Sequence, residues 1–201
     1  DRLNFNRDLG IEAFRNKNYS LAADFFKAAT KVTPNDPEVQ IYYNNALALQ
    51  QGNPLTLAVV VPLNAYRGSA QEILRGVAQA QNRFNAQRKS TNAKLLKIVI
   101  TSDVIAIDDK EPNQAARVAR KLIRKSDILG VIGHWTSRAS SSALKEYEKA
   151  SLAMISPTSS SNAIKSKVFF RTITSNDEIA HKLAKYATDK QLKRVIVFYN
   201  S

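Results

Sequence analysis

Two stretches of this 201-residue chain decide its fold: Ile128-Leu-Gly-Val-Ile-Gly-His-Trp-Thr-Ser-Arg-Ala-Ser-Ser-Ser142 and Leu152-Ala-Met-Ile-Ser-Pro-Thr-Ser-Ser-Ser161. Each begins as a short, continuous apolar run, which is typical of a strand buried on both faces of a parallel sheet. Each run ends in small hydroxyl-bearing residues, at the edge where open α/β sheets bind ligands. Hydroxyls and backbone N–H groups at such an edge suit a small anion such as a carboxylate.

From Leu55 onward, short apolar runs alternate with amphipathic segments. The runs predict strands, and the segments between them predict helices because their apolar residues recur at helical spacing. The predicted strands are Leu57–Val61, Leu95–Ile100, Ile128–Ile132, Ala153–Ile155, the extended Val168–Arg171, and Arg194–Tyr199. The predicted helices are Ser69–Asn85, Asn113–Arg124, Ser140–Ala150 and Asp177–Asp189. Repeated βα units predict an α/β fold with a doubly wound parallel sheet, covered by helices on both faces.

The first quarter of the chain has the pattern of helices alone. Residues 7–16, 19–32 and 37–51 carry apolar side chains at helical spacing, separated by polar or proline-containing turns. Several positions resemble the tetratricopeptide repeat, in which small residues let paired helices approach: Leu9, Gly10, Tyr19, Ala22, Phe26, Ala29 and Pro34. A plain helical hairpin followed by one helix is the alternative.

A break at Gln51-Gly-Asn-Pro54 separates these helices from the alternating part. We therefore expect an all-helical, tetratricopeptide-like module over residues 1–53 and an α/β unit over residues 54–201. The module amounts to about one and a half repeats, fewer than the roughly three that are stable alone, so it should pack on another domain or continue an array.

The net charge of +13 belongs to the α/β unit, since residues 55–201 hold 24 Lys or Arg and 11 Asp or Glu, whereas residues 1–54 hold six of each. Such a bias fits an anionic partner, but a solvated basic surface is the simpler interpretation. Nucleic acid is not favoured, because the basic residues of the predicted helix Asn113–Arg124 lack interleaved aromatic side chains. The chain has no cysteine, which excludes disulfides, thiolate metal sites and a cysteine nucleophile.

The sequence contains no recognisable set of catalytic residues. The chain lacks a glycine-rich phosphate loop, a Gly-x-Ser-x-Gly elbow and a His/carboxylate cluster with metal-ligand spacing. Only two histidines occur, His134 and His181, and for His134 we expect a packed or surface role. The expectation is a binding protein without catalysis, cofactor or metal.

The two hydroxyl-rich strand ends resemble the first lobe of type I periplasmic solute-binding proteins, the leucine/isoleucine/valine-binding class. The resemblance rests on Val131-Ile-Gly-His-Trp-Thr-Ser137, followed by a helix and by Met154-Ile-Ser-Pro-Thr-Ser-Ser160. Further pieces occur in the expected order: Val59–Asn64, Gly76–Asn85, Ser102–Asp103, Glu111–Ala115 and Phe170–Thr172. In the family a second lobe closes over the ligand by a hinge. Arg194–Tyr199 resembles the first strand of that lobe, so we expect a truncated chain, a proteolysed product or a companion segment that supplies the rest.

The resemblance implies a ligand site at the strand ends. Ser137 matches the serine whose hydroxyl and backbone N–H hold the ligand α-carboxylate, and Thr158, Ser159 and Ser160 match groups that contact the carboxylate and the α-amino group. Neutral donors aimed at a carboxylate bind it directionally without burying an unpaired cation. Helix capping and turn formation are the alternative roles of these residues.

Nearby side chains complete the candidate site. Trp135 would form a wall of the ligand cleft or a packing face, and Tyr66, with Arg67, lies in a loop that could cover the ligand. Arg138 departs from the small polar residue usual beside the key serine, which leaves specificity for aliphatic amino acids open.

The resemblance implies an extracytoplasmic protein that binds an amino acid or a related small carboxylate and serves an ABC-type uptake or sensing system. Its partners would be the small ligand and, through the helical module, a membrane transporter or an envelope protein. The alternative is a non-catalytic scaffold that binds partner proteins without a small ligand, similar to the outer-membrane lipoprotein activators of penicillin-binding proteins.

The sequence also bears on location. No apolar run is long enough to span a bilayer, and the first residues lack the apolar core of a signal peptide. Any export signal or lipid anchor has therefore been removed or never existed, and a membrane anchor would lie in a segment absent from this chain. The location that the resemblance implies is the periplasm or cell envelope.

Overall fold

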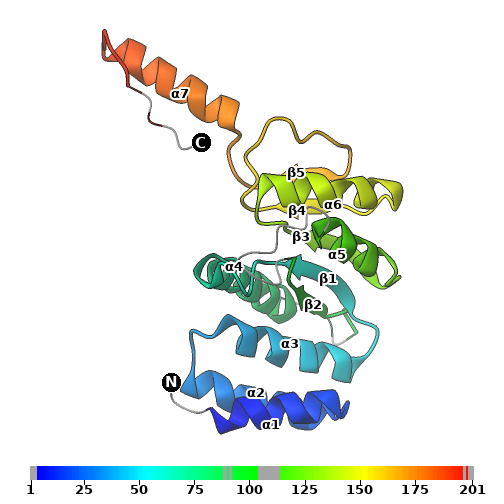
Figure 1. The fold of residues 1–201 in the computed structure, drawn as a ribbon. Coiled ribbons are helices and arrows are strands. Elements are labelled where there is room, and N and C mark those ends of the chain that lie inside the picture. The colour runs from blue at the N-terminus through cyan, green and yellow to red at the C-terminus, as the bar shows by residue number, and fades with distance from the viewer. Residues whose placement is uncertain (1–3, 88–89, 91, 104–113, 197, 199–201) are drawn as a thin grey trace.

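Three helices lead into an α/β unit in the computed structural model, which describes residues 4–87, 90, 92–103, 114–196 and 198 (Figure 1). The three helices are α1 (Phe5–Arg15), α2 (Tyr19–Val32) and α3 (Pro37–Gln51). Their first turns are capped by the side chains of Asn4, Asn18 and Asp36, which accept hydrogen bonds from backbone N–H groups.

A glycine and an aromatic cluster hold these helices together. A Cβ atom at Gly10 would lie 2.8 Å from the ring of Phe26, so only glycine permits this approach of α1 to α2. The ring of Phe14 packs edge-on against Tyr19 and Tyr42 and so joins all three helices. The predicted helical module is present. Its assignment as a tetratricopeptide unit and its boundary at residue 53 stay predictions.

The α/β unit is built on one parallel sheet with the strand order β2-β1-β3-β4-β5. The strands are β1 (Leu55–Val60), β2 (Leu96–Thr101), β3 (Ile128–Ile132), β4 (Met154–Ser156) and β5 (Phe169–Arg171). The helices are α4 (Arg67–Ala86), α5 (Gln114–Ile123), α6 (Ser137–Lys149) and α7 (Asn176–Asp189). The predicted doubly wound parallel sheet is confirmed.

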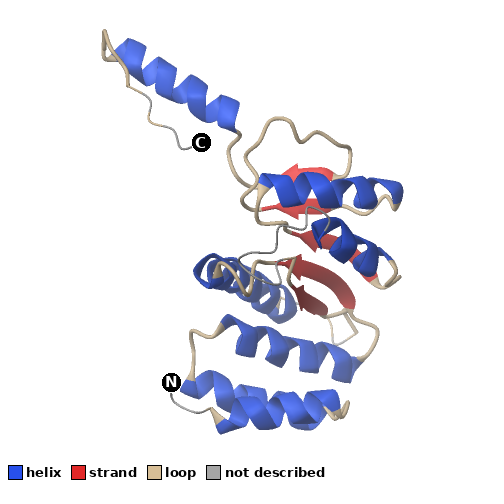
Figure 2. Ribbon diagram, viewed as in Figure 1, coloured by secondary structure: helices blue, strands red, loops and turns tan. Residues whose placement is uncertain are grey.

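Helices lie on both faces of this sheet, as Figure 2 shows. On one face, α5 and α6 pack over β1, β3 and β4 in a cluster that includes Val60, Val118 and Met154. On the other face, α4 packs over β1 and β2 in a cluster that includes Val59, Leu74 and Ile98. Within the described residues this second face is only partly covered, because Ile155 and Phe170 remain largely exposed.

Most predicted elements agree with the structure to within three residues, and two differ in a way that matters. Helix α6 begins at Ser137 rather than Ser140, because the Thr136 side chain caps it by accepting a hydrogen bond from Ala139 N–H. The predicted strand Arg194–Tyr199 is wrong over its described residues, 194–196 and 198, which pair with no strand. A strand requires a partner, and α7 separates this segment from the edge strand β5. The Glu111–Asn113 part of the predicted α5 start lies outside the described residues.

Helix α7 projects away from the sheet and buries none of its residues within the described structure (Figure 1). Its side chains Ile179, Leu183 and Tyr186 are exposed. Among the described helices, none combines the length and the apolar character that crossing a membrane requires.

The outward backbone groups of the edge strand β2 are bound by side-chain amides. The amide of Asn45, on α3, accepts a hydrogen bond from Ile98 N–H and donates one to the Ile98 carbonyl, both at 2.8 Å. Asn85, on α4, pairs in the same way with Leu96, accepting at 2.7 Å and donating at 3.2 Å. Each asparagine thus takes the place of a peptide group of a neighbouring strand.

Further amide bonds tie these asparagines together. Gln81 Nε2 donates to Asn45 Oδ1 and to the Leu96 carbonyl, both at 2.9 Å, and Asn85 donates to Asn44 Oδ1 at 3.1 Å. All four amide side chains are buried. Through them α3 packs on the α/β unit, as expected for a helical module too short to stand alone.

Candidate functional site

The candidate site is formed by the loops that follow β1, β3 and β4 at the carboxyl edge of the sheet. The loop after β3 begins with Gly133, whose φ of +130° favours glycine. A Cβ atom at this position would lie 2.5 Å from the Val60 carbonyl oxygen, at the end of β1. Glycine therefore lets the β3 loop pass directly over the β1 end.

Gly133→Ala is expected to lower the free energy of unfolding by about 2–4 kcal/mol, because it adds both a backbone clash and an unfavourable φ. Chemical denaturation of the variant measures the loss. Gly76→Ala is the matched control, since a Cβ there meets nothing within 4 Å, and it should leave stability unchanged or raise it. Equal stability of the two variants would contradict the close approach at Gly133.

Buried hydroxyls join the β3 and β4 loops. Ser140 Oγ and Ser156 Oγ both donate to the His134 carbonyl, at 3.2 and 2.9 Å. Ser159 is fully buried, its hydroxyl lies 2.6 Å from that of Ser140, and its N–H donates to Ser156 Oγ at 3.0 Å. The Ser159 side chain is thus engaged inside the protein, where it holds the two loops together.

A second link leaves part of the predicted site free. Thr158 Oγ1 donates to the Trp135 carbonyl, which fixes the β4 loop against the β3 loop. In contrast, the hydroxyls of Ser137 and Ser160, both half-buried, make no hydrogen bond to any described residue. Ser137 is also the first residue of α6, where the backbone N–H groups of a helix lack intrahelical acceptors. Of the predicted serines, these two are the ones available to a ligand.

The two predicted aromatic residues meet at the same edge. The rings of Tyr66 and Trp135 lie 4.1 Å apart between centroids and are inclined by 37°. Tyr66 is about half exposed, and Trp135 is half-buried. The structure therefore brings together the loop after β1, which carries Tyr66, and the loop after β3. The side chain of Arg138 is exposed beside Ser137.

The sequence left open whether His134 is packed or on the surface. In the structure its side chain is fully buried. Its Nδ1 lies 2.6 Å from Asp103 Oδ2, and its Nε2 lies 3.1 Å from the Tyr147 hydroxyl. Burial, and then the Asp103 carboxylate, raise the pKa of Tyr147, so its hydroxyl stays protonated. A carboxylate oxygen only accepts, which assigns the ring proton to Nδ1 and leaves Nε2 to accept from the Tyr147 hydroxyl. All three side chains are closed to solvent, so they position the β3 loop rather than contact a ligand.

Sequence reasoning did not connect these three residues. Asp103 follows β2, His134 follows β3 and Tyr147 lies on α6, so only the folded sheet brings them together. The available signal was a polar residue at the end of each of two predicted buried strands. Within the described part of the chain, no group of three His, Cys, Asp or Glu side chains is placed to hold a metal ion.

Comparison with known proteins places this arrangement in a family. Residues 54–201 match the model of the periplasmic binding protein family. A comparison with curated protein sequences returns no match.

Solved structures give the same result. An ABC transporter substrate-binding protein from Desulfitobacterium hafniense is 26% identical, with a TM-score of 0.63, over 74% of this chain and 42% of that one. The structure of such a protein from the same organism in complex with Leu has a TM-score of 0.60 at the same identity and coverage. A putative branched-chain amino acid ABC transporter protein from Rhodospirillum rubrum is 25% identical, with a TM-score of 0.56, over 69% of this chain and 39% of that one.

The chain therefore spans less than half the length of these structures. The family model, in contrast, matches well over half of the chain itself, and the likeness in fold accompanies it. This chain belongs to the periplasmic binding protein family.

Proposed function

We propose that the α/β unit is the first lobe of an extracytoplasmic solute-binding protein that holds the carboxylate of an amino acid or a related small acid. The observation that carries the proposal is the pair of hydroxyls, on Ser137 and Ser160, that make no hydrogen bond to any described residue, whereas the hydroxyls of Ser140, Ser156, Thr158 and Ser159 are engaged in holding the two loops. A loop fixed by buried bonds presents its free donors at low entropic cost, which favours binding.

The chemistry at this edge suits an anion. The start of α6 offers the backbone N–H of Ser137 and the positive end of the helix dipole, and Arg138 adds an exposed cation. The adjacent, tilted rings of Tyr66 and Trp135 would flank the apolar part of the ligand. Ser159 and Thr158 would act by positioning the loops, with the Thr158–Ser160 backbone facing the ligand.

The family supports the remaining parts of the proposal. Periplasmic binding proteins work outside the cytoplasm and deliver their solutes to ABC transporters, so we infer the same location, a transporter partner and a binding role without catalysis. The Desulfitobacterium hafniense structure was solved in complex with Leu. A free amino acid is therefore the first ligand to test.

A thermal-shift screen of the full-length, two-lobed protein against free amino acids and small carboxylates tests the proposal. We expect at least one ligand to raise the melting temperature. Ser137→Ala should lower the affinity for that ligand by about tenfold or more, because a hydrogen bond to a charged group is lost. Ser141→Ala is the matched control, since Ser141 is an exposed serine on the next turn of α6. Absence of any stabilising ligand, or equal affinities of the two variants, would overturn the proposal and favour a scaffold that binds only proteins.

A further inference from the structure

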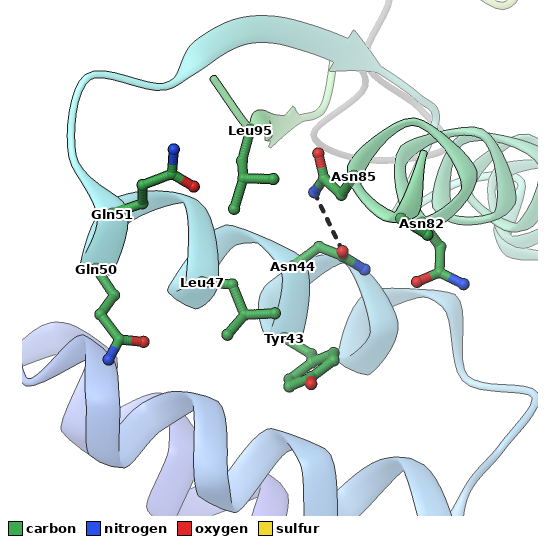
Figure 3. A pocket seen from close by; sticks show the side chains of 9 residues that line it. Tyr43, Asn44, Leu47, Gln50, Gln51, Asn82, Asn85 and Leu95 are labelled. Carbon is green, nitrogen blue, oxygen red and sulfur yellow. Dashed lines mark hydrogen bonds between the residues drawn. The ribbon is translucent and has the colours of Figure 1, made fainter. Parts of the chain in front are cut away.

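A hollow lies away from the candidate site, between α3 and α4. It has a volume of about 650 Å³ and is lined by residues of α3 and α4 and by Leu95, which precedes β2 (Figure 3). A smaller hollow of about 300 Å³ shares Tyr43, Asn44 and Asn82 with it and continues along α3 toward Gln40. We call the two together the amide groove.

The lining of the amide groove has an unusual composition. Half of its lining residues carry side-chain amides, and none of them is Lys, Arg, Asp or Glu, although 23% of the chain is charged. The amides are those of Gln40, Asn44, Gln50, Gln51, Asn82 and Asn85. A groove of this composition selects neutral ligands rich in hydrogen-bonding groups, because it offers donors and acceptors but no countercharge.

Some of these polar groups are available and others are held in place. The exposed side chains of Gln50 and Asn82 make no hydrogen bond to a described residue, and neither does the hydroxyl of the half-buried Tyr43. The amides behind them are fixed by bonds from Asn85 to Asn44 and from Asn44 to the Gln40 carbonyl, both at 3.1 Å. The free groups therefore project from a rigid base, which lowers the entropic cost of binding.

Apolar surface alternates with the amides. Leu47 and Leu95 line the groove, and Tyr43 presents a ring edged by its hydroxyl, as Figure 3 shows. Tyrosine combines an apolar body with a polar tip and suits a ligand that is itself apolar on one side and hydroxylated at its rim. A pyranose ring has this character, and an acetamido substituent adds an amide for Asn82 and a methyl group for the leucines.

An extended peptide fits the groove less well. A peptide would add to the sheet through the outward backbone groups of β2. The N–H and C=O groups of Leu96 and Ile98 are already bound by Asn85 and Asn45. We propose that the amide groove binds a neutral oligosaccharide that carries acetamido groups.

Calorimetric titration of the full chain with N-acetylchitotetraose tests the proposal. We expect binding that changes less than about twofold between about 50 and about 500 mM salt, because no charge is involved. Asn82→Ala and Tyr43→Leu should each weaken it by about three- to tenfold, the loss expected from one hydrogen bond or one ring contact. Gln79→Ala, an exposed amide on α4 outside the lining, is the control and should bind as the unchanged chain does.

Other outcomes would overturn the proposal. Equal affinity for cellotetraose, which has the same linkage without the acetamido groups, would remove the acetamido assignment. The saccharide site would be ruled out by any of three results: no heat of binding at millimolar sugar, binding that disappears with salt, or equal affinities of Asn82→Ala and Gln79→Ala. Binding of a neutral tetrapeptide that Asn82→Ala abolishes, without sugar binding, would assign the groove to peptides instead.

Discussion

His134→Leu is expected to lower the free energy of unfolding by about 3–5 kcal/mol, because it leaves the buried Asp103 carboxyl group without its hydrogen-bond partner. Asp103 Oδ1 already lacks a partner, so within the described part of the chain no other group compensates for the loss. Tyr147 would also lose the acceptor for its hydroxyl. Urea denaturation followed by circular dichroism measures the change.

Two comparisons isolate the cause of this loss. His181→Leu alters the other histidine, which is exposed on α7, and should change stability by less than about 0.5 kcal/mol. The double variant Asp103→Leu/His134→Leu should be more stable than His134→Leu alone, because both polar partners are then removed together. A double variant less stable than the single one would show that the buried carboxyl is not the source of the effect.

Asn45→Ala is expected to lower the free energy of unfolding by about 3–5 kcal/mol, because the truncation removes a hydrogen-bond partner from three buried polar atoms. These atoms are the backbone nitrogen and oxygen of Ile98 and the Nε2 of Gln81. Gln81 Oε1 is already unpartnered within the described structure, so the network has no spare donor to rearrange. The midpoint and slope of chemical denaturation give the change in free energy.

The matched comparison uses an amide of the same region. Gln79→Ala, on the exposed side of α4, should leave stability within about 0.5 kcal/mol of the unchanged chain. Asn85→Ala removes the equivalent pair at Leu96 and should resemble Asn45→Ala. A loss of less than about 1 kcal/mol in the free energy of unfolding of Asn45→Ala would contradict this prediction. It would mean that water replaces the amide and that the edge of β2 does not depend on Asn45.

The periodicity of apolar residues was enough to predict the sheet. The run Ile128–Ile132 is a strand with the predicted bounds, and the two hydroxyl-rich segments do follow neighbouring strands. Runs of this kind depend on local burial alone, which a single sequence records. The strand predicted at Arg194–Tyr199 shows the limit of the same reasoning, since an apolar run needs a partner strand and its described residues have none.

The site was less predictable because its polar residues serve two purposes. From spacing alone, Ser137, Ser159 and Ser160 are equivalent, since each follows a strand and suits a cap or a ligand contact. The fold separates them, because it brings Ser140 to Ser159 and leaves the hydroxyls of Ser137 and Ser160 free among the described residues. Asn45 was missed for a related reason. It lies on the same buried face of α3 as Ile41 and Ala48, and its hydrogen-bond partner is on a strand 53 residues away in the sequence.

The amide pairs on β2 also determine how the helical module moves. Any rotation of α1–α3 relative to the sheet has to break the Asn45 pair with Ile98, and the aromatic cluster around Phe14 makes α1 and α2 follow α3. We therefore expect the helical module and the α/β unit to move together as one body. A molecule held by α1 and α2 would then keep its orientation to the loops after β3 and β4 during any hinge motion.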